Sequence, residues 1–123
     1  MAWDVRYDAA FAVEARAFGR AARVEIAALT ILLRQWGPHL RRPHCDTLKG
    51  SDFTNMKELR FTLPDGEWRI AFAFDPERRA ILLVGGSKSG TNQARFYRNL
   101  VRVADGRFAA HLKTLSPKAG GHQ

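Results

Sequence analysis

Residues 57–88, KELRFTLPDGEWRIAFAFDPERRAILLVGGSK, contain the clearest structural pattern in the sequence. Apolar and polar residues alternate on either side of the PDGE segment, a pattern typical of two adjacent strands joined by a turn. Leu59 and Phe61 share one side of the first strand, and the large apolar residues of the second strand also share one side (Trp68, Ile70, Phe72 and Phe74). If both sets face one core, Arg60 and Arg69 lie directly or diagonally opposite each other on the other face.

This pair of arginines is the first sign of a function. Like charges opposed on neighbouring strands destabilise a sheet unless something anionic lies between them. Arg60 and Arg69 therefore predict a surface that binds an anion.

Two further strands are predicted beside the hairpin. Residues 80–84 form a short apolar run, typical of a central strand buried on both faces, and Gly85-Gly86 is expected to end it. Residues 3–7 alternate between apolar and charged side chains and predict a brief edge strand.

The segment between these strands predicts two helices that cover the sheet. Helices are expected over 9–18 and 20–36, because apolar residues recur at spacings of three and four with a break at Gly19. Their common stripe is Phe11, Ala15, Phe18, Ala22, Ile26, Leu29, Leu33 and Trp36. Gly37-Pro38 ends the second helix, and residues 37–55 are expected to be a connector.

A last helix closes the predicted fold. It is expected to run from about Asn92 to Leu115, with its apolar residues inward and most of its arginines outward. Residues 116–123 are expected to be a disordered tail. The sequence therefore predicts an α+β protein, with one domain over residues 1–115 and no internal repeat.

The charge of the chain points to a polyanionic partner. The net charge of the 123 residues is +8, of which residues 1–36 contribute +1 (five basic and four acidic) and residues 37–123 contribute +7 (fifteen basic and eight acidic). Basic charge concentrated in one part of a small domain favours nucleic acid over a membrane, and a merely soluble basic protein is the plain alternative.

The remaining composition limits the compartment and the cofactors. A single cysteine, Cys45, excludes an internal disulfide and favours a reducing compartment. Neither a secretory signal nor a membrane span is predicted, so we expect a cytoplasmic protein. His44, Cys45 and Asp46 are consecutive and lack the spacing of a metal site, and the glycines near Lys88 do not have P-loop spacing. We expect neither a metal nor another cofactor.

The ends of the strands and the start of the last helix gather the candidate catalytic residues, namely Glu58, Arg60, Arg69, Lys88 and Tyr97. Basic residues around them are candidates for RNA binding (Lys49, Lys57, Arg95 and Arg98). Fixed positive charge suits phosphoryl chemistry, because arginines hold a phosphate and stabilise the charge that builds on its oxygens. RNA supplies its own nucleophile, the 2′-hydroxyl. Glu58 or Lys88 could take its proton, Tyr97 or Lys88 could protonate the leaving 5′-oxygen, and Tyr97 could instead stack on a base.

Nearly the whole chain, about residues 3–115, resembles a known family. The runs RPHCDTLKGSDFTNMKELRF, EWRIAFAFDPERRAILLVGGSKSG and FYRNLV are similar to the phage-derived Gp49-like, HigB-type branch of the RelE/ParE superfamily of bacterial toxins. The resemblance implies a RelE-like fold, in which an N-terminal strand and a helical hairpin pack on a small, mainly antiparallel sheet that a C-terminal helix closes.

The resemblance also implies roles for particular residues. Arg69 matches the family's phosphate-binding arginine, and Lys88 lies near the basic residue that follows the last strand. Tyr97 lies near the aromatic residue of the final helix, and Glu58 and Arg60 match a charged pair on the preceding strand. The chain departs from the family in two respects: the SKSGTNQ loop is longer than in the best-known RelE proteins, and no histidine stands beside Tyr97.

By resemblance, the expected function is that of a toxin of a type II toxin–antitoxin system. Such toxins are metal-independent endoribonucleases that cleave mRNA, mostly on the ribosome, and so inhibit translation. A cognate antitoxin is implied, commonly a helix-turn-helix protein of the HigA kind. Two alternatives stay open: a ParE-like, non-enzymatic inhibitor of a topoisomerase such as gyrase, and an RNA-binding module without catalysis.

Overall fold

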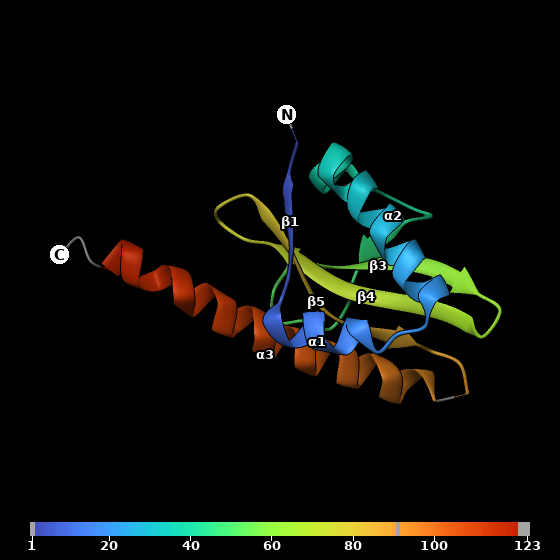
Figure 1. The fold of residues 1–123 in the computed structure, drawn as a ribbon. Coiled ribbons are helices and arrows are strands. Elements are labelled where there is room, and N and C mark those ends of the chain that lie inside the picture. The colour runs from blue at the N-terminus through green and yellow to red at the C-terminus, as the bar shows by residue number, and fades with distance from the viewer. Residues whose placement is uncertain (1, 91, 121–123) are drawn as a thin grey trace.

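The computed structural model describes residues 2–90 and 92–120, with side chains described as far as residue 115. Figure 1 shows a sheet with helices on both faces. In chain order the elements are β1 (Asp4–Tyr7), α1 (Ala9–Arg16), α2 (Arg20–Trp36), the 3-10 helix η1 (Gly37–His39), β2 (Cys45–Thr47), β3 (Met56–Leu63), β4 (Gly66–Phe74), β5 (Arg79–Ser87) and α3 (Gln93–Gly120).

The sheet has five strands in the order β1-β5-β4-β3-β2. β1 lies parallel to β5 at one edge, and the other three pairings are antiparallel. The predicted α+β class, the mainly antiparallel sheet and the edge position of the first strand are confirmed.

The two faces of the sheet bury different sets of side chains. The face beneath α1 and α2 packs the large residues of the hairpin, including Leu59, Trp68 and Phe72, against the buried stripe of the two helices. The opposite face packs small residues of β4, such as Ala71 and Ala73, against Leu100 and Phe108 of α3. Small side chains on this second face let a helix lie close to the sheet, and the polar residues of β3 and β4 share that face with α3.

The register of the β3–β4 hairpin places the two arginines as predicted. Arg60 is the direct partner of Arg69, and the pairing extends to Leu63 and Gly66, so that only Pro64 and Asp65 remain in the turn. The side chain of Asp65 accepts a hydrogen bond from the Trp68 indole at 3.0 Å, which stabilises this tight end of the hairpin.

Two expectations about the strands are wrong. β5 does not end before Gly85-Gly86 but continues to Ser87, because Gly85 pairs with Ile70 and Gly86 with Arg69. A Cβ atom at Gly85 would overlap the Ile70 side chain, so glycine is needed there for close packing rather than for a turn. In addition, the predicted connector contains β2, which pairs with β3 through Cys45–Thr47.

The helices also differ from the prediction at their ends. Trp36 belongs to the predicted buried stripe but is 56% exposed at the last position of α2. α3 runs to Gly120, five residues beyond its predicted end, and its last turns project past the sheet (Figure 1). The remainder of the predicted tail, residues 121–123, lies outside the described residues.

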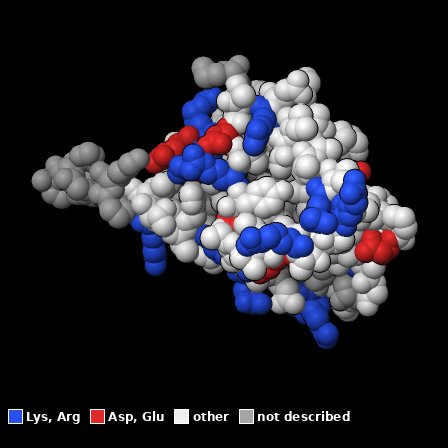
Figure 2. Space-filling view, viewed as in Figure 1, with Lys and Arg blue, Asp and Glu red and all other residues white. Residues whose placement is uncertain are grey.

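Basic side chains are spread over the face that Figure 2 shows. On the face in view in Figure 2, Lys and Arg side chains outnumber Asp and Glu side chains, in keeping with a net charge of +8. Within the described residues, no helix is long and apolar enough to cross a membrane.

Candidate functional site

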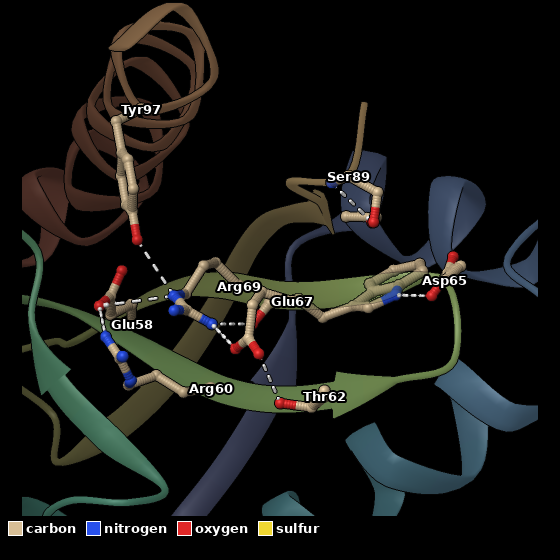
Figure 3. A network of polar contacts seen from close by, with 10 residues as sticks. Glu58, Arg60, Thr62, Asp65, Glu67, Arg69, Ser89 and Tyr97 are labelled. Atoms are coloured by element: carbon tan, nitrogen blue, oxygen red, sulfur yellow. Dashed lines mark hydrogen bonds and ion pairs between the residues drawn. The ribbon is translucent and has the colours of Figure 1, made fainter. Parts of the chain in front are cut away.

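Four of the five predicted catalytic residues meet where the β3–β4 hairpin faces the start of α3 (Figure 3). Glu58 and Arg60 alternate with core residues along β3, and Arg69 lies across from Arg60 on β4. Tyr97, in the first turns of α3, directs its hydroxyl down onto Arg69. Strand alternation and one helical turn therefore bring together residues that are up to 39 positions apart in the sequence.

Arg69 is buried and held on several sides. It is 3% exposed. Its Nε donates to the Tyr97 hydroxyl at 3.0 Å, and its Nη1 donates to the Trp68 carbonyl at 2.8 Å and to Glu67 at 3.3 Å. A guanidinium held in this way fixes the position of the Tyr97 hydroxyl and presents little of its own surface to a ligand.

Glu58 supplies the negative charge that the opposed arginines require. Its Oε2 accepts from Arg60 Nη1 at 2.7 Å and lies 3.8 Å from Arg69 Nε. The anion predicted to lie between the arginines is thus, in this structure, a side chain of the same sheet. Glu58 is 4% exposed, and its Oε1 has no hydrogen-bond partner among the described residues. An unpartnered buried carboxylate oxygen is unfavourable unless a ligand can donate to it.

Lys88, which directly follows β5, joins the cluster through the ring of Tyr97. Its Nζ lies 5.3 Å from the centre of the Tyr97 ring. Partial burial lowers the pKa of Lys88 below its ordinary value, and the positive charges of Arg69 and Arg60 lower it further. A lysine with a lowered pKa exchanges a proton more readily near neutral pH, which suits it to either of the proton transfers considered above.

The cluster borders two hollows on the surface. The smaller, of about 310 Å³, is lined by Arg42, Asp46, Thr47, Leu48, Lys49, Glu58, Arg60 and Tyr97. The larger, of about 620 Å³, is lined by Arg42, Pro43, His44, Arg60, Phe61, Thr62 and Glu67. Arg42 and Arg60 line both, so the two hollows adjoin each other along these two side chains. Arg69 is buried beside these hollows and does not line them. The positive charge at their shared wall comes from Arg60, which is partly exposed, and from Arg42.

The predicted RNA-binding residues are placed unequally. Lys49 lines the smaller hollow. Lys57 lies between Met56 and Glu58 on β3, so alternation turns it to the opposite face of the sheet. Arg95 lines a different hollow, formed by α3 with the end of β5, and Arg98 is exposed on α3. Of the four, only Lys49 is brought into the cleft that contains Glu58 and Arg60.

Part of this cleft was not predicted from the sequence. Arg42 lies in the predicted connector and was not among the predicted site residues, and neither were Glu67 and Thr62. The unpredicted β2 strand explains the first omission, because pairing of Cys45–Thr47 with β3 positions Arg42 beside Arg60. In the part of the chain that is described, no group of three or more His, Cys, Asp or Glu side chains could hold a metal ion.

Comparison of the sequence with known families and proteins gives consistent relatives. Residues 14–109 match the family described as phage derived protein Gp49-like. The candidate toxin HigB3 of Mycobacterium tuberculosis is 48% identical over 92 residues, which cover 74% of this chain and 77% of the relative. The candidate toxin HigB2 of the same organism is 45% identical over 82 residues, which cover 66% of this chain and 40% of the relative.

Comparison with solved structures gives the fold. A mutant of the Escherichia coli toxin RelE in its free state superposes with a TM-score of 0.57 at 15% identity, over 82% of this chain and 95% of that one. The intact Escherichia coli RelBE toxin–antitoxin complex matches with a TM-score of 0.52 at 13% identity, over 72% of this chain and 99% of the matched chain. The predicted RelE-like fold is therefore confirmed, and at these identities the likeness concerns the fold alone.

Proposed function

The chain belongs to the phage derived Gp49-like protein family, and on this premise we propose that it is the toxin of a toxin–antitoxin pair and cleaves mRNA without a metal ion. The relatives named as candidate HigB toxins support the first part of the proposal. The second part depends on the chemistry of the cleft.

The observation that carries the proposal is the unpartnered Oε1 of Glu58. This buried oxygen points away from the two arginines (Figure 3). Glu58 also forms part of the wall of the smaller hollow. A ligand hydroxyl that enters from the hollow and displaces the packing over Oε1 would supply the missing donor. The 2′-hydroxyl of RNA is such a donor and is also the nucleophile of metal-free RNA cleavage.

The proposed reaction transfers two protons. Glu58 takes the proton of the 2′-hydroxyl while the 2′-oxygen forms a bond to phosphorus and the bond from phosphorus to the 5′-oxygen breaks. Lys88 or Tyr97 supplies the proton that the 5′-oxygen needs, which leaves a 2′,3′-cyclic phosphate and a 5′-hydroxyl. Arg60 stabilises the charge that builds on the phosphate oxygens, and Arg69 acts by fixing the Tyr97 hydroxyl at 3.0 Å.

The proposed partners follow from the same function. We expect the substrate to be mRNA on translating ribosomes in the cytoplasm. We also expect a cognate antitoxin of the helix-turn-helix, HigA-like kind, in line with the toxin–antitoxin complex among the structural neighbours.

The experiment is to induce the protein briefly in cells and to map new 5′ ends of mRNA by sequencing. Wild-type protein should arrest growth and produce new ends, and Glu58→Gln and Arg60→Gln should reduce both at least a hundredfold, because general-base and charge-stabilising groups each contribute about that much. Arg69→Ala is a poorer test, because it also removes the hydrogen bonds that Arg69 donates to the Tyr97 hydroxyl and to Glu67.

The matched control is Arg6→Gln. Arg6 is also a strand arginine paired with an acid two residues earlier, with Nε 2.9 Å from Asp4, but it lies on the edge strand β1. The Arg6→Gln variant should cleave mRNA like the wild type. Full cleavage by both Glu58→Gln and Arg60→Gln would exclude the proposed mechanism.

A second candidate function, RNA binding without cleavage, is favoured by one observation. Arg69 is buried and already bonded to Tyr97, Glu67 and the Trp68 carbonyl, so its guanidinium is not free to hold a phosphate directly. Under this alternative, induction would leave mRNA 5′ ends unchanged while RNA cross-links to the chain.

A further inference from the structure

The larger hollow, of about 620 Å³, is not used by the proposed reaction. It lies on the other side of Arg60 from Glu58 and Tyr97, and only Arg42 and Arg60 belong to both hollows. A strand of RNA whose scissile phosphate lies at the smaller hollow must continue in some direction. The shared arginines make the larger hollow a continuous path for it.

One end of this hollow is cationic. Arg42 is 68% exposed and is held by Asp46, with Nη2 2.7 Å from Oδ2. Arg60 lies beside it, and the His44 ring adds a group that can form hydrogen bonds. Two guanidinium groups at one rim favour a phosphate there, because each can donate two parallel hydrogen bonds to phosphate oxygens.

The other end is acidic, which is unexpected in a channel for a polyanion. The side chain of Glu67 is 49% exposed. Its Oε2 accepts from the Thr62 hydroxyl at 2.9 Å, and its Oε1 from Arg69 Nη1 at 3.3 Å, as Figure 3 shows. The hydrogen bonds from Thr62 and Arg69 lower the pKa of Glu67 below its ordinary value, so the carboxylate is charged at neutral pH. A carboxylate repels phosphate but accepts hydrogen bonds from the amino groups of bases.

The backbone at this end is also available. The pairing of β2 with β3 covers Lys57–Leu59, and the last bond across it runs from the Arg60 N–H to the His44 carbonyl. Because backbone groups of a strand point to the same edge at every second residue, those of Thr62 turn outward as well, beyond the end of β2. They border the hollow beside Glu67 and can read a base edge.

We propose that the larger hollow is a second nucleotide subsite, in which Arg42 and Arg60 hold a phosphate and Glu67 selects a base that carries an exocyclic amino group. The inference rests on the proposed function, since it assumes that the ligand is RNA. Adenine, cytosine and guanine each offer an amino group. Uracil offers a single N–H between two carbonyl oxygens that the carboxylate repels. The nucleotide next to the cleaved bond on this side is therefore A, C or G in preference to U, by about tenfold, the size expected for one good base contact in an open site.

The test is the sequence preference around the cut. Cells expressing the wild-type chain, Glu67→Gln or Glu77→Gln are compared by mapping mRNA 5′ ends, and base frequencies are counted at each position beside the cut. Glu77 is the matched control: it lies in the turn between β4 and β5 and, like Glu67, has its carboxylate 3.3 Å from a neighbouring arginine, here Arg79. The discrimination against U at one position should largely disappear in Glu67→Gln and persist in Glu77→Gln.

The outcomes separate the two proposals. New 5′ ends without any base preference in the wild type, or a preference unchanged in Glu67→Gln, overturn the subsite and leave the nuclease standing. No new 5′ ends from the wild type overturn the nuclease itself.

A binding measurement decides the case in which Glu67→Gln does not cleave. The wild-type chain is titrated with AMP, CMP, GMP and UMP, and amide NMR shifts are followed at Thr62 and Glu67. Saturable shifts with AMP, CMP and GMP, at affinities about tenfold above that of UMP, support the subsite. Equal responses to all four nucleotides, or none, overturn it.

Discussion

The surroundings of Lys88 change its chemistry. Its Nζ faces the Tyr97 ring at 5.3 Å, and partial burial followed by the charges of Arg69 and Arg60 lowers its pKa. In the unfolded chain the lysine has its ordinary pKa. The folded state therefore binds this proton less tightly than the unfolded state, so the contribution of Lys88 to stability increases as pH rises from the lowered pKa to the ordinary value of 10.5.

We predict that Lys88→Gln stabilises the fold at pH 7 and reduces RNA cleavage. The variant removes a charge that the folded state disfavours, and with it a proton donor of the proposed reaction. Its melting temperature should exceed that of the wild type at pH 7, and the difference should shrink towards pH 10. Lys49→Gln, at an exposed position on the same cleft, should leave the melting temperature nearly unchanged. A lower melting temperature for Lys88→Gln at pH 7 would contradict the prediction.

For single residues, the sequence predicted the face of the sheet on which a side chain lies better than it predicted the contacts of that side chain. The period of two placed Glu58, Arg60 and Arg69 on one face, because strand alternation needs no knowledge of the rest of the chain. The burial of Arg69 and the unpartnered oxygen of Glu58 could not be predicted, since both depend on how close Tyr97 comes from an element 28 residues later.

Among the elements, α3 depends on polar contacts at both ends of the sheet. The Asp75 carboxylate, at the end of β4, is fully buried and contacts Arg79 Nη2 at 2.9 Å and His111 Nε2 of α3 at 2.8 Å. Burial by itself raises the pKa of Asp75, but the hydrogen bonds from His111 and Arg79 outweigh it and lower the pKa below its ordinary value of 3.8. The stability that Asp75 contributes is therefore present above pH 3.8 and is lost as pH falls through the lowered value.

We predict that Asp75→Asn destabilises the fold by about 3 kcal/mol at pH 7, because it removes the buried charge that His111 and Arg79 share and leaves Arg79 with Glu77 alone among the described acids. Chemical denaturation measures the change, and the variant should also lose most of the fall in stability below pH 3.8. Asp46→Asn is the control: Asp46 also has a lowered pKa but pairs with Arg42 at the surface, so its loss should cost less than about 1 kcal/mol. Equal costs at the two positions would contradict this account.

A helix or strand could be predicted when it was long enough for its pattern of apolar residues to repeat. The helices and the long strands have several turns or alternations, and the sequence predicted them within a few residues. β2 has three residues, too few for a period, and it exists because β3 offers an edge to pair with. Gly85-Gly86 suggested a chain break, but β4 holds these residues in the sheet through Ile70 and Arg69.

For the whole molecule, the charge of +8 predicts how binding responds to salt. If Arg42, Lys49, Arg60 and Lys88 each neutralise about one phosphate, the affinity for single-stranded RNA should fall roughly fiftyfold between 50 and 200 mM salt. The probe is a 2′-O-methyl RNA, which cannot be cleaved, and fluorescence anisotropy measures its dissociation constant. Arg42→Gln should make the slope of log affinity against log salt concentration shallower, by the contribution of about one phosphate contact. An affinity independent of salt would exclude the electrostatic cleft.

The overall architecture was predictable because the two faces of the hairpin differ in kind. Large side chains such as Trp68 and Phe72 required a helical layer on one face, and Ala71 and Ala73 allowed a helix close to the other. The position of Arg42 beside Arg60 was not predictable, because it depends on how the connector folds back over the sheet.

The hydrogen bonds of Asp105 have a mechanical consequence. This residue of α3 accepts from the Ser51 hydroxyl at 2.5 Å and from the Asp52 N–H at 2.9 Å, and Phe53 packs edge-on against Phe108 at 5.0 Å. The turn that follows Lys49 is thereby fastened to the middle of α3, while Tyr97 is fastened to the sheet. Displacement of α3 from the sheet would therefore move the Tyr97 phenol and Lys49 out of the cleft together. A partner that binds the outer face of α3 and displaces this helix would disrupt both walls of the cleft without entering it.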